Sequence, residues 1–300
     1  MRDSILSFSG ARYLWVALVL VIGSVVAYLW HDPVGLPNGG TWLGYTLGTM
    51  GALLILWLMA FGIRKRRYAA RMGTLLGWAS AHVYLGTALI VIVFLHAGFQ
   101  VGLNIHSLAL LLMLLVIASG LFGLFAYLRY PALMTRNRDN TTRQAMLEEI
   151  AELDQQALSL ADAVDPKIHA AILRSNERTR VGGSAWQLLR PREDTDSAID
   201  QVRTYLEQRD AEKRSNERTR DMPTMFAMVD FLSSHAADSK NEALRKLMDV
   251  LARKKTVTTR LSRDLQLQAL MEIWLYVHVP LSFALLGALT AHVVSVFFYW

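Results

Sequence analysis

Four of the eight histidines lie inside long apolar stretches, and their spacing is the feature of this sequence most able to support chemistry. His82 and His96 are 14 positions apart, and His278 and His292 are again 14 positions apart. In an α-helix, 14 residues turn through roughly 1400°, about 40° short of four full turns, and rise about 21 Å. Each pair is therefore expected on nearly one helix face, at two depths. A neutral imidazole can bind a metal or relay protons, so the pattern predicts two functional levels.

The distribution of charge indicates that these stretches cross a membrane. The chain is 53% hydrophobic and 19% charged, and Lys and Arg are missing from three segments, 13–63, 72–128 and 264–300. A membrane span may be apolar on every side, whereas a helix in water needs a polar face. We therefore predict an all-α integral membrane bundle of five spans: Tyr13–Trp30, Trp42–Ile63, Thr74–Phe99, Ser107–Leu128 and Leu267 to the end of the chain.

The remaining polar residues form one insert, which gives a division into residues 1–130, 131–266 and 267–300. Apolar residues recur at helical spacing in Gln144–Ala163 and Asn241–Lys254, so the insert is predicted to be helical. Between Arg129 and Asp264 lie 24 of the 31 basic residues and 22 of the 25 acidic ones. The local charge excess is small, which argues against nucleic-acid binding despite the net charge of +6.

Basic residues also orient the predicted spans. The loops 31–40 and 100–106 contain no Lys or Arg, whereas five basic residues connect the second span to the third. The positive-inside rule then places the N-terminus and the insert in the cytoplasm, and both basic-free loops and Trp300 outside. The third and fifth spans consequently run in the same direction.

Parallel helices bring His82 to the depth of His278, and His96 to the depth of His292. At each level two imidazoles face each other across a gap that suits a planar macrocycle, which predicts two bis-histidine b-type haems. The chain has no cysteine, which excludes covalent c-type attachment and thiolate-bound iron–sulfur clusters. A single buried histidine can serve only helix packing, but two helices that repeat one spacing favour ligation.

Local sequence around these histidines resembles known cytochromes. The segments are His82-Val-Tyr-Leu-Gly86, Leu95-His96-Ala-Gly-Phe99, Ala118-Ser-Gly-Leu-Phe-Gly123 and Trp274…His278-Val-Pro280…His292. They are similar to a bacterial family of di-haem membrane cytochrome b proteins, and the plan resembles respiratory cytochrome b and the ferric-reductase-like membrane domains. The resemblance covers spans three to five. It implies that the four histidines ligate two haems and that the protein relays electrons across a bacterial cytoplasmic membrane.

Two histidine ligands on each iron leave no open position for a substrate, so we expect a conductor rather than a self-sufficient enzyme. Its donor and acceptor would be a quinone or partner subunits, with a c-type cytochrome outside and a flavin or iron–sulfur protein inside. No nucleotide- or flavin-binding sequence is present in the chain. Two other interpretations stay open: a non-redox scaffold or sensor that signals through the insert, and a proton-coupled transporter that uses the histidines.

Further residues are candidates for contact with a haem or a quinone. Glycines permit close approach, and Gly86 is expected beside the haem at His82. Arg71 is the cation nearest the third span and could pair with haem propionates. Candidates for a quinone or partner site are Glu272, His31, Asp32 and His106. Glycines of the second and fourth spans could also face a haem: Gly44, Gly48, Gly51, Gly120 and Gly123.

Overall fold

The computed structural model describes residues 4–33, 37–66, 73–100, 102, 104–139, 141–178, 182–189, 199–208, 211 and 227–298, and omits the side chains of 227–239. Within these ranges the chain is helical and no β-strand occurs, which confirms the all-α fold class. The chain divides into two compact units, one of residues 1–128 with 274–300 and one of residues 129–273. Helices α4 (Ile105–Arg138) and α9 (Ala227–Phe298) contribute to both.

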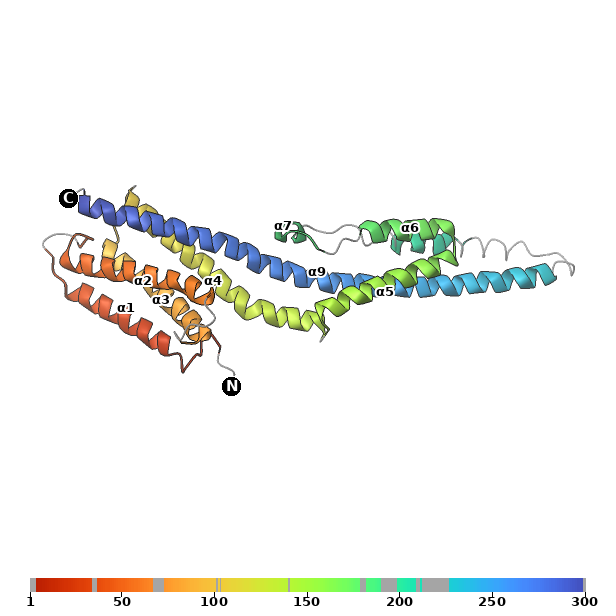
Figure 1. The fold of residues 1–300 in the computed structure, drawn as a ribbon, viewed down its shortest axis with the longest axis horizontal. Helices are drawn as coiled ribbons and strands as arrows, with labels where there is room; N and C mark the ends of the chain where they lie inside the picture. The colour runs from red at the N-terminus through yellow and green to blue at the C-terminus, as the bar shows by residue number, and fades with distance from the viewer. Residues whose placement is uncertain are drawn as a thin grey trace. The chain divides into compact units, whose positions relative to one another are not determined.

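Five helices of the described chain are long and apolar enough to cross a membrane. Three of them are α1 (Arg12–Trp30), α2 (Trp42–Arg66) and α3 (Leu75–Ala97), and the other two are α4 and α9. These match the five predicted spans. Figure 1 shows α1, α2, α3, α4 and the C-terminal part of α9 running alongside one another in the first unit.

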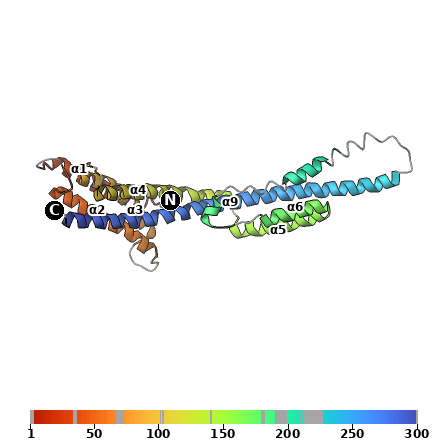
Figure 2. The same cartoon turned by 90° about the horizontal axis from the view of Figure 1, so that it is seen from above.

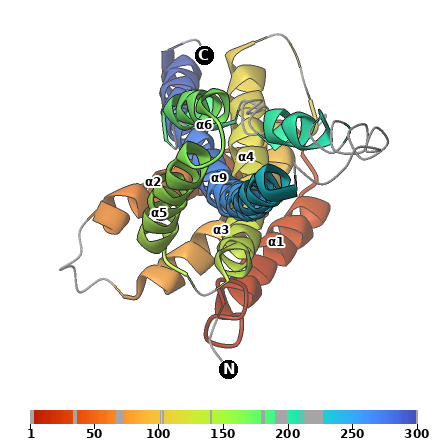
Figure 3. The same ribbon diagram turned by 90° about the vertical axis from the view of Figure 1, so that its right-hand side faces the viewer.

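Large apolar side chains cover the outer surface of the first unit. On α1, Val19 is 70% exposed and Leu29 is 78% exposed, and Phe283 of α9 is 62% exposed. A continuous apolar surface of this kind would be costly in water and is normal against lipid. Figure 3 looks along these helices and shows α1 at the margin of the unit, where its outer face is open. The exposed apolar surface supports the assignment to a membrane.

The interior of the first unit contains several apolar clusters. One joins α1 to α3 through Ala17, Ala81 and Leu85. Another, described here as the central cluster, joins four helices and contains Ile55, Leu89, Met113 and Leu285. Because the central cluster takes one buried residue from each of α2, α3, α4 and α9, it fixes the packing of the helices that carry the histidines.

Helix ends explain where the observed elements differ from the predicted spans. Helix α3 starts after Thr74, whose hydroxyl accepts a hydrogen bond from the backbone of Gly77, and it ends at Ala97, before the capping residue Gly98, whose φ is 58°. Helix α4 starts at Ile105, because Asn104 caps it by accepting from the Ser107 backbone at 3.0 Å. The N-terminal end of the fourth span therefore lies two residues before the predicted position.

Helix α4 also continues past the predicted end of the fourth span. It passes through Pro131, taken as the start of the insert, and ends at Arg138. A proline inside a helix removes its own N–H donor and frees one carbonyl, here that of Tyr127, and the helix tolerates this near a membrane boundary.

The second unit is a helical bundle with a core of its own. Its elements are α5 (Arg143–Asp162), α6 (Pro166–Arg178), the short α7 (Ala185–Leu188), a helical stretch at 199–208 and the first part of α9. In Figure 2, α5 and α6 lie beside this part of α9. Their contact is apolar: Ile172, Leu244 and Leu247 are fully buried in one cluster. The helices predicted at 144–163 and 241–254 are thus confirmed.

An ion triad around a buried carboxylate joins three helices in the second unit. The carboxylate of Asp264 on α9 is fully buried, and it accepts hydrogen bonds from Arg138 at 2.7 and 2.9 Å and from Arg143 at 3.1 and 2.7 Å. Removal from water by itself raises the pKa of Asp264, but the hydrogen bonds and charges of the two arginines outweigh this effect and hold the pKa below its usual range. The triad therefore fixes the end of α4 and the start of α5 against α9.

Candidate functional site

Helix α2 orients the two histidines of α3. The Nδ1 atom of His82 lies 3.2 Å from the carbonyl oxygen of Leu58, and Nδ1 of His96 lies 2.7 Å from the carbonyl oxygen of Gly44. Leu58 and Gly44 are themselves 14 residues apart, in the opposite order along the chain. The antiparallel register of α2 and α3 thus supplies one backbone carbonyl to each histidine.

These two hydrogen bonds decide which ring nitrogen can bind a metal. A carbonyl oxygen can only accept, so Nδ1 of His82 and of His96 must each carry the proton. In a neutral imidazole the lone pair then lies on Nε2, and within the described chain Nε2 of neither ring has a hydrogen-bond partner. Metal-binding histidines are typically held this way, with the second nitrogen donating to a carbonyl.

Glycines on α2 open the space for one of these rings. A Cβ built on Gly48 would lie 2.6 Å from Cε1 and 2.8 Å from Nδ1 of His96, well inside normal contact. Gly48 is one helical turn beyond Gly44, so the missing side chain exposes the Gly44 carbonyl to the imidazole. At Gly86, by contrast, a Cβ would meet only a methyl group of Leu58, at 3.9 Å. Protein packing demands a glycine at 48 but not at 86.

On α9, His278 is held by the middle of α4. Its Nδ1 atom lies 3.1 Å from the hydroxyl of Ser119, and the indole of Trp274, one turn earlier, donates to the Ser119 carbonyl at 2.8 Å. A Cβ on Gly123 would lie 2.0 Å from the Trp274 ring, so only glycine fits at that position. The structure thereby brings together two of the segments on which the family resemblance rests. Gly120 also borders His278, where a Cβ would lie 3.6 Å from Cε1.

The fourth histidine has a different partner. Nδ1 of His292 lies 2.7 Å from Nδ1 of His106, and the two rings are perpendicular with centroids 4.5 Å apart. His106 was predicted to lie in a loop, but it occupies the first turn of α4. The helix-capping residue Asn104 was the sequence signal for this position, because asparagine is a preferred residue before a helix.

The central cluster sets the register of α3 against α9. Leu89 follows His82 by seven residues, Leu285 follows His278 by seven, and both leucines are buried in the central cluster. At one end of this layer the rings of His96 and His292 face each other with centroids 6.0 Å apart. Helices α3 and α9 therefore carry their histidines at two levels separated by an apolar layer.

The distance between the ring centroids of His96 and His292 suits a metal bound between the two imidazoles. A metal–imidazole bond is about 2.0 Å and the ring centroid lies roughly 1.1 Å beyond the nitrogen, so ligands on opposite sides place their centroids roughly 6 Å apart. The observed separation is 6.0 Å, with the rings perpendicular at 86°. No group of three or more metal-binding side chains occurs in the described chain. Two imidazoles alone can complete the coordination of an iron ion only where a macrocycle supplies the other donor atoms. The residues present therefore fit a haem.

Among the described residues, Glu272, His31 and Asp32 have no contact with the four histidines of the apolar spans. Arg71 lies outside the described residues. Glu272 accepts a hydrogen bond from Gln268 of its own helix at 2.9 Å, and His31 packs edge-on against Trp42 at 5.1 Å. Asp32 is exposed. Among the candidates for a quinone or partner site, His106 is the one that the structure connects to a histidine of the apolar spans.

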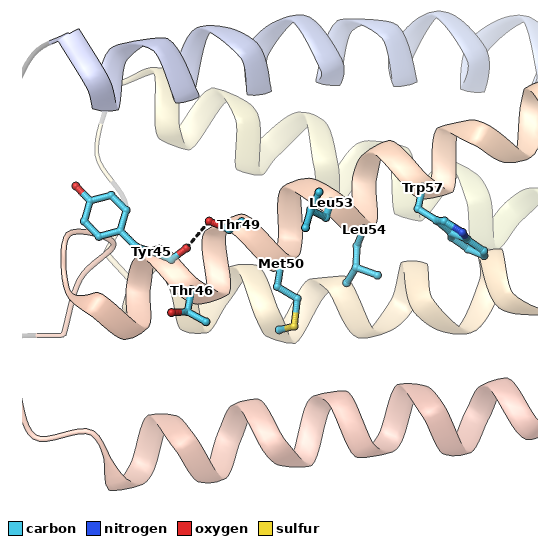
Figure 4. A pocket seen from close by; sticks show the side chains of 7 residues that line it. All are labelled: Tyr45, Thr46, Thr49, Met50, Leu53, Leu54 and Trp57. Carbon is cyan, nitrogen blue, oxygen red and sulfur yellow. Dashed lines mark hydrogen bonds between the residues drawn. The ribbon is translucent and has the colours of Figure 1, made fainter.

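A surface cavity of about 830 Å³ lies along α2, and none of the four histidines is among its lining residues (Figure 4). The hydroxyls of Thr46 and Thr49 donate to carbonyls of the same helix at 2.9 and 2.8 Å, so they present no free donor to the cavity. The cavity offers mainly apolar surface and no histidine, acid or base among its lining residues, which are Tyr45, Thr46, Thr49, Met50, Leu53, Leu54 and Trp57. It has the character of a lipid-facing groove.

The fold and the site together define a class: a helical protein with five helices apolar enough to cross a membrane, in which four histidines of α3 and α9 each have a hydrogen-bond partner at Nδ1. Searches against protein-family models, curated proteins and solved structures found no match to this chain.

Proposed function

We propose that this protein is a di-haem electron-transfer subunit of a membrane oxidoreductase. The observation that carries the proposal is how the four histidines are held: each Nδ1 has a hydrogen-bond partner on a neighbouring helix. The carbonyl partners of His82 and His96 leave the lone pair on Nε2 of those rings. The hydroxyl of Ser119 and the imidazole of His106 can each accept from Nδ1 of His278 and His292, and in that tautomer Nε2 of these rings is a ligand as well. A packing role would not require all four rings to be held through the same atom.

The residues of the chain would bind and position the two haems. His82 and His278 would hold one haem, and His96 and His292 the other. Haem bound in this way supplies one-electron transfer without an open iron position, so the chain conducts electrons and does not transform a substrate by itself. Gly48 and Gly123 admit the rings of His96 and Trp274. The apolar residues of the central cluster keep water out of the layer between the two levels.

The charge pattern indicates which haem level lies on which side of the membrane. With the N-terminus and the second unit in the cytoplasm of a bacterium, the His82/His278 level lies toward the inside of its cytoplasmic membrane and the His96/His292 level toward the outside. A flavin or iron–sulfur protein would then exchange electrons at the inner level, and a c-type cytochrome at the outer one. A quinone is the alternative partner at either side.

The proposal is tested by the absorption spectrum of the purified protein after reduction with dithionite. We expect sharp α and Soret bands, with two haems per chain. His82→Ala and His96→Ala should each remove one haem and leave the other. A colourless protein, produced in cells with ample haem, would contradict the proposal and favour the scaffold or transporter interpretation.

The orientation is tested separately by labelling single cysteines, because the natural chain has none. Asp32→Cys, in the loop between α1 and α2, should react with an impermeant maleimide in intact cells. Ser184→Cys, in the second unit, should react only after the cells are permeabilised. The reverse pattern would invert the proposed topology without affecting the haem assignment.

A further inference from the structure

His106 stands out among the groups that hold the four histidines. The partners of His82 and His96 are backbone carbonyls, which no substitution removes, and the partner of His278 is a hydroxyl. Only His292 is held by another imidazole. His106 is exposed and belongs to the first turn of α4, so the interior of the unit does not depend on its side chain.

The hydrogen bonds also differ between the two levels. At the His82/His278 level the distances from Nδ1 to the partner are 3.2 and 3.1 Å. At the His96/His292 level both are 2.7 Å. A shorter hydrogen bond from the N–H of a ligand gives the imidazole more anionic character and makes it a more basic ligand. A more basic ligand stabilises the oxidised metal more than the reduced one.

We propose that His106 is a positioning residue for His292: it accepts the hydrogen bond from Nδ1 of His292, directs Nε2 of His292 to the iron, and lowers the reduction potential of that haem alone. This inference rests on the proposed function. Since two nitrogens 2.7 Å apart need one donor and one acceptor, ligation through Nε2 of His292 assigns the donor to His292 and the acceptor to His106. The N–H of His106 then lies on Nε2, the nitrogen not bonded to His292.

The test is a potentiometric titration of the two haems, followed by their α bands, in three variants of the whole protein. His106→Leu removes the acceptor, and His106→Gln keeps an acceptor oxygen on a side chain of similar reach. His31→Leu is the matched control, because within the described residues His31 packs on Trp42 and no contact joins it to any of the four ligands.

In His106→Leu we expect one haem to become easier to reduce. Its ratio of reduced to oxidised form at a fixed potential should rise about tenfold, which corresponds to about 59 mV for a one-electron couple. The other haem should not change, His106→Gln should restore most of the shift, and His31→Leu should have no effect. Loss of that single haem in His106→Leu, with retention in His106→Gln, would support the same role.

Two outcomes would overturn the inference. Unchanged potentials in His106→Leu would show that the contact does not tune the ligand, and equal shifts of both haems would show a general structural effect. In either case two haems are still bound, so the proposed function stands. Absence of haem from the unmutated protein would overturn the proposed function as well, which keeps the two failures distinguishable.

Discussion

Replacing Gly48 by alanine should selectively weaken the haem level of His96. The new Cβ would lie 2.6 Å from Cε1 of His96, whereas ordinary contacts begin at 3.4 Å, so the ring must retreat by about 0.8 Å. That movement lengthens the 2.7 Å hydrogen bond to Gly44 beyond a useful distance. The loss of a neutral hydrogen bond costs about 1 kcal/mol, and the loss of a group that orients a metal ligand lowers metal affinity about 10- to 100-fold.

Gly62→Ala provides the matched control on the same helix. A Cβ at Gly62 would have nothing within 4 Å, so the substitution adds a methyl group without a clash. Alanine is favoured over glycine in a helix by up to about 1 kcal/mol, so Gly62→Ala should leave haem binding unchanged and should not lower stability.

The assay is the rate at which each haem leaves the purified protein for an excess of an apo-globin acceptor. Gly48→Ala should release one haem about 10 to 100 times faster and the other at the unmutated rate. Equal rates for Gly48→Ala and the unmutated protein would refute the reasoning, because they would show that the Gly44 carbonyl does not hold the ring that binds haem. Faster loss in Gly62→Ala would refute it as well.

Three further outcomes follow from the contacts around α4 and α9. Gly123→Ala should displace Trp274 and release the haem of the His278 level faster than Gly287→Ala, whose Cβ would meet nothing within 4 Å; equal haem-loss rates would argue against the contact. Ser119→Ala should raise the potential of that same haem, and a redox titration that shows no shift would count against the hydroxyl as a partner. Asp264→Asn should destabilise the second unit by about 1.5–3 kcal/mol at neutral pH in denaturant unfolding of the whole protein, because it removes the buried charge that accepts hydrogen bonds from two half-buried arginines. The depressed pKa of Asp264 means that its stabilisation is present above the usual aspartate value of about 3.9 and is lost as the pH falls through the lower folded-state pKa. The difference between the two proteins should therefore shrink below about pH 4, and a constant difference down to the acid limit would contradict the triad's role.

The fold was largely predictable from the sequence, because the spans are long, apolar and free of basic residues. The predicted spans at 13–30, 42–63 and 74–99 differ from α1, α2 and α3 by three residues or fewer at each end. The end of α4 was not predictable in the same way. Polar residues and a proline mark Pro131–Arg138 as a connection, but the helix continues there, and the bond from Arg138 to the buried Asp264 fixes its end.

The residues that hold the histidines were harder to predict than the histidines. The 14-residue spacing of the histidines is visible in the sequence. A backbone carbonyl that accepts a hydrogen bond is not, because every residue type carries one. The acceptors at Leu58 and Gly44 became apparent only once the register of α2 against α3 was known. A partial indication was present in the sequence at Gly48, one turn beyond Gly44. A small residue at position 48 leaves the Gly44 carbonyl accessible to the His96 ring.

The most direct measurement for the central claim is the haem content of double histidine variants. If His82 and His278 share one haem, then His82→Ala combined with His278→Ala should retain one haem per chain, as each single variant does. His82→Ala combined with His292→Ala should retain none, because the two substitutions then affect different haems. One haem in both double variants, or two haems in either, would contradict the arrangement of two haems between α3 and α9.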